Sequence, residues 1–252
     1  MQLIDADTEA AVTSALVAGY RSIDTAAIYG NEAGVGRALA ASGIVRDELF
    51  VTTKLWNGDQ GYDSTLAAFD ASLAKLGLDH VDLYLIHWPA PGRDTYLDTW
   101  RAFERIQAEG RARAIGVSNF QPAHLQRLID NSDVVPAVNQ VELHPRLQQA
   151  GLRAFHARHG IATEAWSPLA QGAVLKEPVV TGIAGRLGRT PAQVILRWHL
   201  QLGNVAIPKS VTPERIRQNI DVFDFALTED DITAITALDD GTRIGPDPDA
   251  FN

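Results

Sequence analysis

One pattern recurs along the whole sequence: a segment of helical periodicity, a glycine, and then a short run of β-branched or other apolar residues. The first unit reads as a helix from about Thr8 to Ala18, ends at Gly19 and continues as a strand over 21–25. Glycine is a common C-terminal cap, and apolar residues spaced three and four apart mark a helix face. Strands that alternate with helices imply parallel pairing, so the pattern predicts an α/β fold.

The pattern contains seven strands, predicted over 21–25, 49–54, 81–87, 112–117, 137–143, 161–166 and 205–208. The last helix begins at Thr228, and Asp231 three residues later makes a variant capping box. The absence of a linker or low-complexity stretch indicates one domain that spans residues 1–252. Strict repetition favours a (β/α)8 TIM barrel rather than an open sheet.

A barrel of this kind needs eight strands and opens on one, whereas this pattern opens on a helix. We therefore expect the first barrel strand to be absent. The strands over 21–25 and 205–208 should flank the gap without pairing, because a barrel's first strand lies between its second and its eighth. The alternative is that Met1 to Ile4 fill the gap.

Composition narrows the classes of function. The chain has 22 Lys and Arg against 31 Asp and Glu, a formal net charge of −9, which disfavours non-specific nucleic-acid binding. It has no cysteine, which excludes disulfides, thiolate metal sites and cysteine nucleophiles. No apolar run approaches the roughly 20 residues of a transmembrane helix, and the first residues are not a signal peptide. We expect a monomeric cytoplasmic protein with no metal, nucleic-acid or membrane partner.

Four groups of complementary chemistry end successive strands. Asp24 lies at the end of the first strand and Tyr29 shortly after it, Lys54 ends the second strand, and His87 ends the third. Function in such barrels sits at the C-terminal strand ends. A phenol has a pKa of about 10, a nearby ammonium lowers it, and a buried lysine needs a carboxylate partner to stay charged. Asp24 is expected to hold Lys54, Lys54 to tune Tyr29, and His87 to orient a carbonyl oxygen. Each residue alone is more often a structural polar residue, but the four compatible groups together favour catalysis.

Later strand ends carry amides and hydroxyls beside an indole. Ser118 and Asn119 follow the fourth strand, Gln140 lies in the fifth, and Trp166 ends the sixth. This set suits a flat polar heterocycle, with Trp166 stacked on the ring and Asn119 and Gln140 bonded to a carboxamide. The alternative is that Trp166 packs in the core and the amides are structural, and Trp166 alone would favour that alternative.

A local positive cluster follows the last strand. Lys209 and Ser210 precede Thr212, which suits a helix N-cap, and Pro213, which suits the first helical position. Arg215 follows within the first turn. A helix N-terminus with such neighbours is an anion site, and a phosphate is the predicted guest. The alternative is that Lys209 and Arg215 are solvated surface residues.

Two other signals are weak. The run Gly34-Val35-Gly36 lies inside a helical pattern and lacks the third glycine of a dinucleotide fingerprint. His156 and His159 lie three residues apart on a predicted helix, and we expect both to face solvent because no third metal ligand is apparent.

Taken together, these motifs resemble the aldo-keto reductase family. The resemblance runs in order across nearly the whole chain and rests on the segments 23–32 (IDTAAIYGNE), 85–89 (LIHWP), 115–120 (IGVSNF), 139–142 (NQVE) and 207–210 (IPKS). Trp166, where many relatives carry tyrosine, and the short acidic tail are similar to the bacterial 2,5-diketo-D-gluconate reductase branch. Family members open with a hairpin and a first barrel strand, and this sequence begins after both.

The resemblance implies an NADP-dependent oxidoreductase that uses NADPH to reduce a carbonyl group, with Tyr29 as proton donor, Asp24 and Lys54 tuning it, and His87 orienting the substrate. Trp88 would line the substrate pocket with Tyr29 and His87. The implied cofactor residues are Ser118, Asn119 and Gln140 at the nicotinamide amide, with Trp166 stacked behind it. Ser167, Leu169, Gln171 and Gly172 lie in the loop 167–178 that would fold over the pyrophosphate. Lys209, Ser210 and Arg215 would bind the 2′-phosphate, Gln218 and Asn219 would reach the adenine, and Val211 would be a further cofactor contact.

The substrate is expected to be small. Trp88, with Trp56 and Tyr84, is the only source of a large apolar wall, and the C-terminal tail is short. We expect compounds such as methylglyoxal or diketo sugar acids rather than steroids. Two alternatives remain at this point: a cofactor-binding regulatory or sensor protein on the same scaffold, and an inactive truncated form. A measurement of NADPH binding and turnover separates them from an enzyme.

Overall fold

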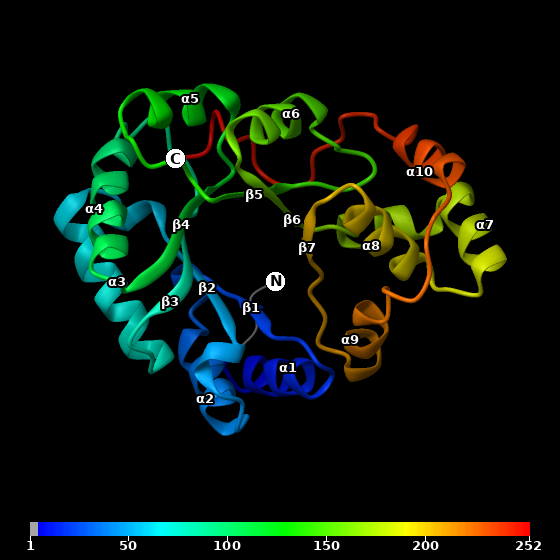
Figure 1. The fold of residues 1–252 in the computed structure, drawn as a ribbon, viewed down its shortest axis with the longest axis horizontal. Helices are drawn as coiled ribbons and strands as arrows, with labels where there is room; N and C mark the ends of the chain where they lie inside the picture. Colours follow the sequence, from blue (N-terminus) through cyan, green and yellow to red (C-terminus); the bar gives the residue numbers. More distant parts are fainter. Residues whose placement is uncertain (1–4) are drawn as a thin grey trace. The chain divides into compact units, whose positions relative to one another are not determined.

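Parallel strands follow one another in chain order, each joined to the next through one or more helices (Figure 1). The computed structural model describes residues 5–252, so the possibility that Met1 to Ile4 fill a strand position lies outside the described residues. Within the described part, the chain forms two compact units. The first ends at Asn139 and includes Asp247–Asn252, and the second is Gln140–Pro246.

The first unit contains a parallel sheet covered by helices. Its strands are β1 (Ser22–Asp24), β2 (Phe50–Leu55), β3 (Val81–Ile86), β4 (Ala112–Ser118) and the start of β5 (Val138–Glu142). Its helices are α1 (Asp5–Val17), α2 (Glu32–Ala41), α3 (Tyr62–Leu76), α4 (Tyr96–Ala108) and α5 (Pro122–Asp130). In Figure 1, α2, α3 and α4 lie along the same side of β1 to β4.

The second unit continues the alternation. It contains the end of β5 and the parallel pair β6 (Ala162–Trp166) and β7 (Val205–Ile207). Its helices are α6 (Ala150–His159), α7 (Pro178–Leu187), α8 (Pro191–Gln201), α9 (Pro213–Ile220) and α10 (Glu229–Thr236), with the 3-10 segment η4 (Ala170–Lys176) after β6. Thr228 caps α10 by accepting from the backbone N–H of Asp231, so the predicted capping box is confirmed.

The strand order is β1-β2-β3-β4-β5-β6-β7, and β1 and β7 are the two ends of that order. The prediction of seven strands is thus confirmed for residues 5–252. Each observed strand lies inside its predicted span or within one residue of it.

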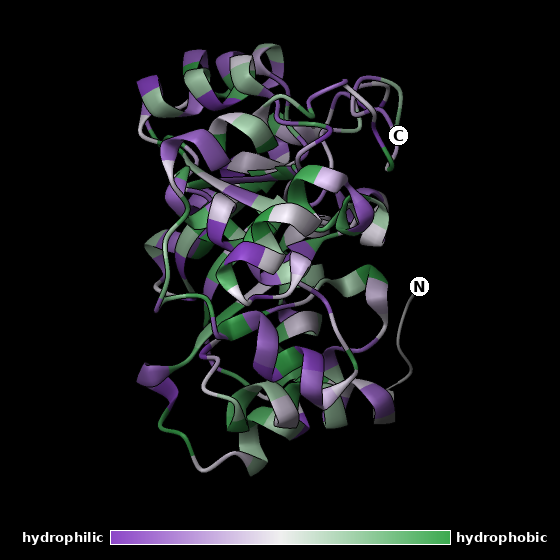
Figure 2. Ribbon diagram, turned by 90° about the vertical axis from the view of Figure 1, so that its right-hand side faces the viewer, coloured by the Kyte–Doolittle hydropathy of each residue, from purple (hydrophilic) through white to green (hydrophobic). Residues whose placement is uncertain are grey.

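The core of the first unit fills the space between the strands and the helices. Tyr84 of β3 is fully buried, and its ring centroid lies 4.6 Å from Phe69 of α3 and 4.4 Å from Phe103 of α4. The expectation that Tyr84 helps to wall a substrate pocket is therefore wrong. Figure 2 shows hydrophobic and hydrophilic residues alternating along the helices, as expected where one face packs on strands and the other meets water.

Gly36 has a packing role rather than a nucleotide-binding one. A Cβ atom at this position would lie 2.4 Å from the backbone oxygen of Leu76 and 2.7 Å from its carbonyl carbon. Backbone atoms cannot move aside as a side chain can. The glycine therefore lets α2 approach the end of α3 closely.

The expectation that His156 faces solvent is also wrong. His156 is fully buried on α6, and its Nδ1 lies 2.8 Å from the Thr163 hydroxyl of β6. Burial and the nearby Arg153 lower the pKa of His156 to about 4, so the ring is neutral at physiological pH. His159 is partly exposed and stacks on Phe155 with a centroid separation of 4.3 Å.

Candidate active site

A buried ion pair joins the ends of the first two strands. Asp24 is the last residue of β1 and Lys54 the penultimate residue of β2. Lys54 Nζ donates to Asp24 Oδ1 at 2.5 Å and to the Thr25 backbone oxygen at 2.9 Å. The Lys54 side chain is fully buried and that of Asp24 is 12% exposed. The expected pairing of Asp24 with Lys54 is present, and it fixes the ammonium group in one place.

Tyr29 ends the 3-10 turn η1 (Ala27–Tyr29) that follows β1. Lys54 Nζ lies 5.4 Å from the centre of its ring. Burial raises the pKa of the Tyr29 phenol, Lys54 lowers it by charge and by a hydrogen bond, and Asp24 raises it. The net shift is upward, so burial outweighs the expected lowering by Lys54. At neutral pH the phenol keeps its proton.

His87 follows β3, and its backbone N–H donates to the Leu55 oxygen at 3.1 Å. Its ring meets Tyr29 edge-on at 5.7 Å and Trp56 edge-on at 5.4 Å between centroids. Burial and the charge of Lys54 hold the pKa of His87 well below its usual value. Ring atom Nδ1 is buried without a hydrogen-bond partner among the described residues. His87 is therefore a neutral imidazole at the same strand ends as the ion pair.

An aromatic wall stands beside these polar groups, and one of its members was missed by the sequence reasoning. Phe251 of the C-terminal tail packs on Trp88 at 4.7 Å and on Trp56 at 6.2 Å between centroids. The next residue, Asn252, accepts a hydrogen bond from the Gly92 backbone N–H at 2.5 Å, and this bond holds the end of the tail in place. Phe251 is the only aromatic residue after Asp239, a signal that could have singled it out.

Ser118 is the last residue of β4, Asn119 follows it, and both are nearly fully buried. Asn119 has a left-handed backbone with φ of 65°. Its side-chain amide nitrogen lies 3.1 Å from the Ser118 hydroxyl and 3.0 Å from the His87 backbone oxygen, and it donates to both. Asn119 thereby links the end of β4 to the residue that follows β3.

The second unit holds the other residues predicted around a flat ring. Gln140 is buried in β5, and its side-chain amide donates to Glu164 of β6 at 2.8 Å, a partner that the sequence reasoning did not identify. Trp166 ends β6 and is partly exposed. Ser167 and Gln171 adopt left-handed backbones with φ of 49° and 53°, and Gly172 has φ of 94°. Leu169 lies within the same irregular segment.

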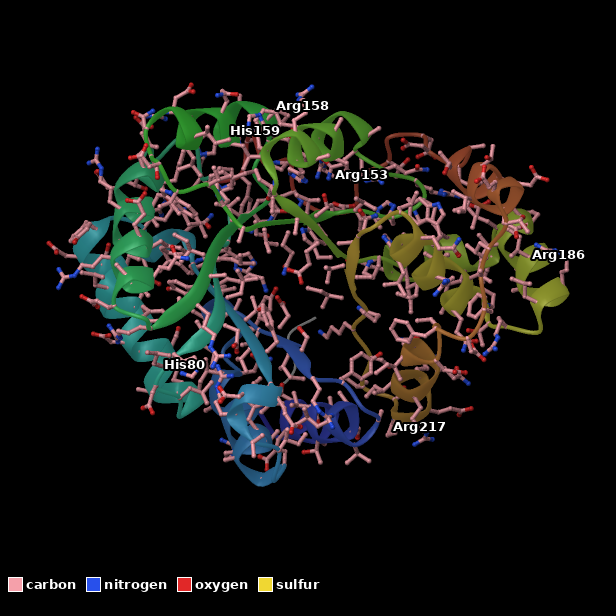
Figure 3. All side chains as sticks on the ribbon, viewed as in Figure 1. His80, Arg153, Arg158, His159, Arg186 and Arg217 are labelled. Carbon is pink, nitrogen blue, oxygen red and sulfur yellow. The ribbon has the colours of Figure 1, made fainter. Side chains whose placement is uncertain are left out.

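The predicted anion cluster lies before and on α9. Lys209 is exposed, and the Ser210 hydroxyl accepts from the Thr212 backbone N–H at 3.2 Å. Thr212 occupies the N-cap position but makes no side-chain capping bond. Arg215 and Val211 are exposed, Gln218 is partly exposed and Asn219 is buried. Arg217, also on α9, projects away from β7 (Figure 3).

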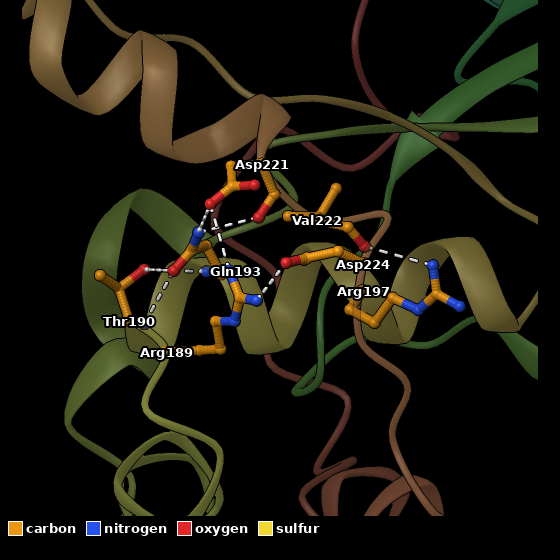
Figure 4. Close-up of polar contacts among 7 residues, drawn as sticks. All are labelled: Arg189, Thr190, Gln193, Arg197, Asp221, Val222 and Asp224. Atoms are coloured by element: carbon orange, nitrogen blue, oxygen red, sulfur yellow. Dashed lines mark hydrogen bonds and ion pairs between the residues drawn. The ribbon is translucent and has the colours of Figure 1, made fainter.

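A polar network fixes the end of α9 (Figure 4). Gln193 of α8 donates to the Asp221 backbone oxygen at 2.8 Å, and Arg189 pairs with Asp221 Oδ2 at 3.1 Å and also with Asp224. Arg197 donates to the Val222 backbone oxygen at 3.2 Å. These contacts hold in place the segment that directly follows Gln218 and Asn219.

The described part of the chain has neither a membrane-spanning helix nor a cluster of metal ligands. No helix there is long and apolar enough to cross a membrane. No three histidine, cysteine or carboxylate residues among those the structure describes are grouped as ligands for a metal ion.

Comparisons with known proteins match nearly the whole chain. The model of the aldo/keto reductase family matches residues 2–240. An aldo-keto reductase of Mycolicibacterium smegmatis is 62% identical, with 98% of this chain and 90% of the relative covered. A protein named methylglyoxal reductase DkgA from Yersinia pestis is 56% identical, with coverage of 97% and 88%.

Solved structures of similar proteins agree with the family match. An aldo/keto reductase from Brucella melitensis superposes with a TM-score of 0.92 and 58% identity, with 94% of this chain and 92% of that chain covered. A Gox0644 variant in complex with NADPH gives a TM-score of 0.96 at 48% identity, with coverage of 100% and 92%. A putative 2,5-diketo-D-gluconic acid reductase B gives 0.93 at 38% identity, with coverage of 97% and 88%.

Proposed function

Because the chain belongs to the aldo/keto reductase family, whose (β/α)8 fold class it shares, we propose that it reduces a small aldehyde, ketoaldehyde or sugar ketone with NADPH. The observation that carries the proposal is the joint placement of Asp24, Tyr29, Lys54 and His87 at the C-terminal ends of β1 to β3. This set provides a neutral acid, a fixed cation and a neutral hydrogen-bond donor at one strand edge.

When bound, NADPH would supply the hydride that the carbonyl carbon takes up and would itself be oxidised to NADP+. Tyr29 gives its phenolic proton to the carbonyl oxygen, so the C=O double bond becomes an alcohol and the phenolate is left to be reprotonated from water. Lys54 stabilises that phenolate, and Asp24 keeps Lys54 charged and in place. His87, being neutral, orients the carbonyl by donating a hydrogen bond rather than by giving up a proton.

The residues present fit a nicotinamide adenine dinucleotide phosphate. A partly exposed indole at Trp166 offers a stacking surface, and exposed cations before and on α9 suit a phosphate. We propose that Ser118, Asn119 and Gln140 bind the carboxamide. For the remaining groups of the cofactor, the proposed residues are Ser167, Leu169, Gln171 and Gly172 at the pyrophosphate, Lys209, Ser210, Val211 and Arg215 at the 2′-phosphate, and Gln218 and Asn219 at the adenine.

The aromatic wall supports a small substrate. Phe251 packs on both Trp56 and Trp88, and Trp56 packs on His87, which places an apolar wall beside the polar donors. The similarity to a protein named methylglyoxal reductase points in the same direction. We propose small ketoaldehydes and sugar ketones as substrates, and expect methylglyoxal to be turned over far more efficiently than a steroid ketone.

The test compares Tyr29→Phe with Tyr62→Phe, whose ring lies on the exposed side of α3. Loss of NADPH absorbance is followed with methylglyoxal, and NADPH affinity is measured by fluorescence. Tyr29→Phe should reduce kcat by about 10²–10⁴-fold, the usual contribution of general acid catalysis, while NADPH affinity stays within about twofold. Tyr62→Phe should leave both unchanged.

Three outcomes would count against the proposal. Near wild-type reduction by Tyr29→Phe would remove Tyr29 from the role of proton donor. NADPH binding by the wild type without turnover of any small carbonyl compound would indicate a regulatory protein. Absence of NADPH binding would indicate an inactive form.

A further inference from the structure

Glu142, at the end of β5, is a fully buried carboxylate that takes no part in the reaction proposed above. Its Oε1 accepts from the Ile244 backbone N–H at 2.6 Å and its Oε2 from the Gly245 backbone N–H at 2.8 Å. His144 Nε2 lies 3.0 Å from Oε1. Burial alone would raise the pKa of Glu142, but these hydrogen bonds outweigh it and lower the pKa. The group is therefore a carboxylate at neutral pH.

The same stretch of chain holds the tail at further points. The backbone oxygen of Arg146 accepts from the N–H groups of Thr242 at 3.1 Å and Asp240 at 3.3 Å. Arg243 adds a cation 3.8 Å from Glu142 Oε2. Residues 240–245 of the tail are thus bound along the end of β5 and the loop that follows it. Glu142, which is fully buried, binds Ile244 and Gly245.

The anchored tail ends against Trp166. A Cβ atom at Gly245 would lie 2.4 Å from Cη2 and 3.2 Å from Cζ2 of the Trp166 indole, and 3.0 Å from Glu142 Oε2. Only glycine lets the tail backbone come this close to the benzo edge of the ring. The bonds to Glu142 draw Gly245 to the position where it limits the movement of that ring.

We propose that Glu142 and Gly245 are positioning residues, which together hold the Trp166 indole at a fixed orientation as the stacking surface for the nicotinamide ring. The role given to Trp166 rests on the proposed function. The physical gain is preorganisation, because a ring already held in its bound orientation loses less freedom when the cofactor stacks on it.

The main test is Gly245→Ala, with Gly182→Ala as its control. Gly182 lies on the exposed side of α7, and a Cβ there would meet nothing within 4 Å. A Cβ at 245 would displace the indole, and the ring would have to return against that overlap when NADPH stacks on it, so NADPH binding should weaken about 5- to 150-fold. The KM for methylglyoxal at saturating NADPH should change less than about twofold. Gly182→Ala should bind NADPH as the wild type does.

A second background shows whether the effect acts through the indole. Phenylalanine at position 166 lacks the two ring atoms that a Cβ at 245 would strike. In a Trp166→Phe background, Gly245→Ala should therefore add little further loss of NADPH affinity. An equal loss in both backgrounds would overturn the proposed route through Trp166.

The last measurement separates this proposal from the proposed function. The near-ultraviolet circular dichroism difference between the wild type and Trp166→Phe isolates the Trp166 signal without any cofactor. Glu142→Gln, which replaces one acceptor oxygen by an amide that faces a backbone N–H, should diminish that signal, as should Gly245→Ala. An unchanged signal in both variants would refute the positioning role. Failure of the wild type to bind NADPH would instead refute the proposed function and leave this result standing.

Discussion

Replacing Asp24 by asparagine probes how strongly the buried ion pair shapes this protein. Lys54 is fully buried and donates to the Asp24 carboxylate at 2.5 Å and to the Thr25 backbone oxygen at 2.9 Å. Asparagine preserves the size of the side chain but removes its charge. Removing one partner of a buried pair typically costs about 3–5 kcal/mol, because the remaining charge is left uncompensated. In a chain of this size each kcal/mol lowers Tm by about 2–4 °C, so we expect a fall of about 6–20 °C.

The chain contains a matched control for this substitution. Asp98 pairs with Arg101 at 2.9 Å on α4, but these side chains are 61% and 65% exposed. Exposed pairs contribute about 1 kcal/mol or less, so Asp98→Asn should lower Tm by no more than about 4 °C. Both variants are compared by differential scanning calorimetry at the pH and salt of the wild type.

A double variant sharpens the test. Asp24→Asn with Lys54→Met removes the uncompensated cation, and an apolar replacement of a buried pair is often neutral. Most of the lost Tm should return, whereas reduction of methylglyoxal should not. If Asp24→Asn melts within about 2 °C of Asp98→Asn, loss of the buried pair costs much less than about 3–5 kcal/mol. If the double variant melts no higher than Asp24→Asn, the loss does not arise from an unpaired Lys54.

Three further predictions use comparisons within the chain. Arg215→Ala should weaken NADPH binding roughly 10- to 150-fold, as loss of a charge-assisted bond does, with NADH nearly unaffected; Arg217→Ala should alter neither, and equal weakening of both cofactors would make Arg215 structural. Gly36→Ala should lower Tm, because its Cβ would overlap the backbone at the end of α3, whereas Gly182→Ala should leave Tm unchanged or raise it; equal melting temperatures would refute the close approach of α2 and α3. The folded-state pKa of His87 lies well below the unfolded value of about 6.5, so its contribution to stability is complete above that pH and is lost as pH falls toward the folded pKa. Between pH 6 and pH 5 the wild type should therefore lose about 1 kcal/mol more unfolding free energy than His87→Gln, and parallel pH curves in urea titrations would contradict this.

The polar groups of the candidate site could be found from the sequence because parallel strands end at one edge. The end of a predicted strand located each of Asp24, Lys54 and His87. The register pairs Asp24 with Thr52 and Lys54 with Leu85, so the ends of these neighbouring strands lie beside one another as expected. The strands themselves followed from repetition. No separate knowledge of side-chain packing was needed to bring these three residues together.

The sequence-based predictions failed where they depended on which face of an element a side chain lies on, or on a contact between distant parts of the chain. Tyr84 and His87 are three residues apart at one strand end, and alternation along a strand puts them on opposite sides; Tyr84 therefore joins the core under α3 and α4. His156 was misplaced because a spacing of three on a helix does not tell which face is buried. Phe251 lies in a tail without periodicity, and only the fold brings it to Trp88.

The charge states of the described groups narrow the choice of proton donor in the proposed reaction. Burial and Lys54 keep His87 neutral, so an imidazolium is not available at neutral pH to give up a proton. Lys54 donates hydrogen bonds to the Asp24 carboxylate and to the Thr25 backbone oxygen. Tyr29 remains, and its pKa is raised by burial despite the adjacent ammonium. The phenol is thus fully protonated when a substrate arrives, and the attraction of Lys54 acts on the phenolate that forms as the proton leaves. Burial favours the neutral acid before the transfer and Lys54 favours its conjugate base after it, so the two opposing effects on one pKa serve successive stages of the same step.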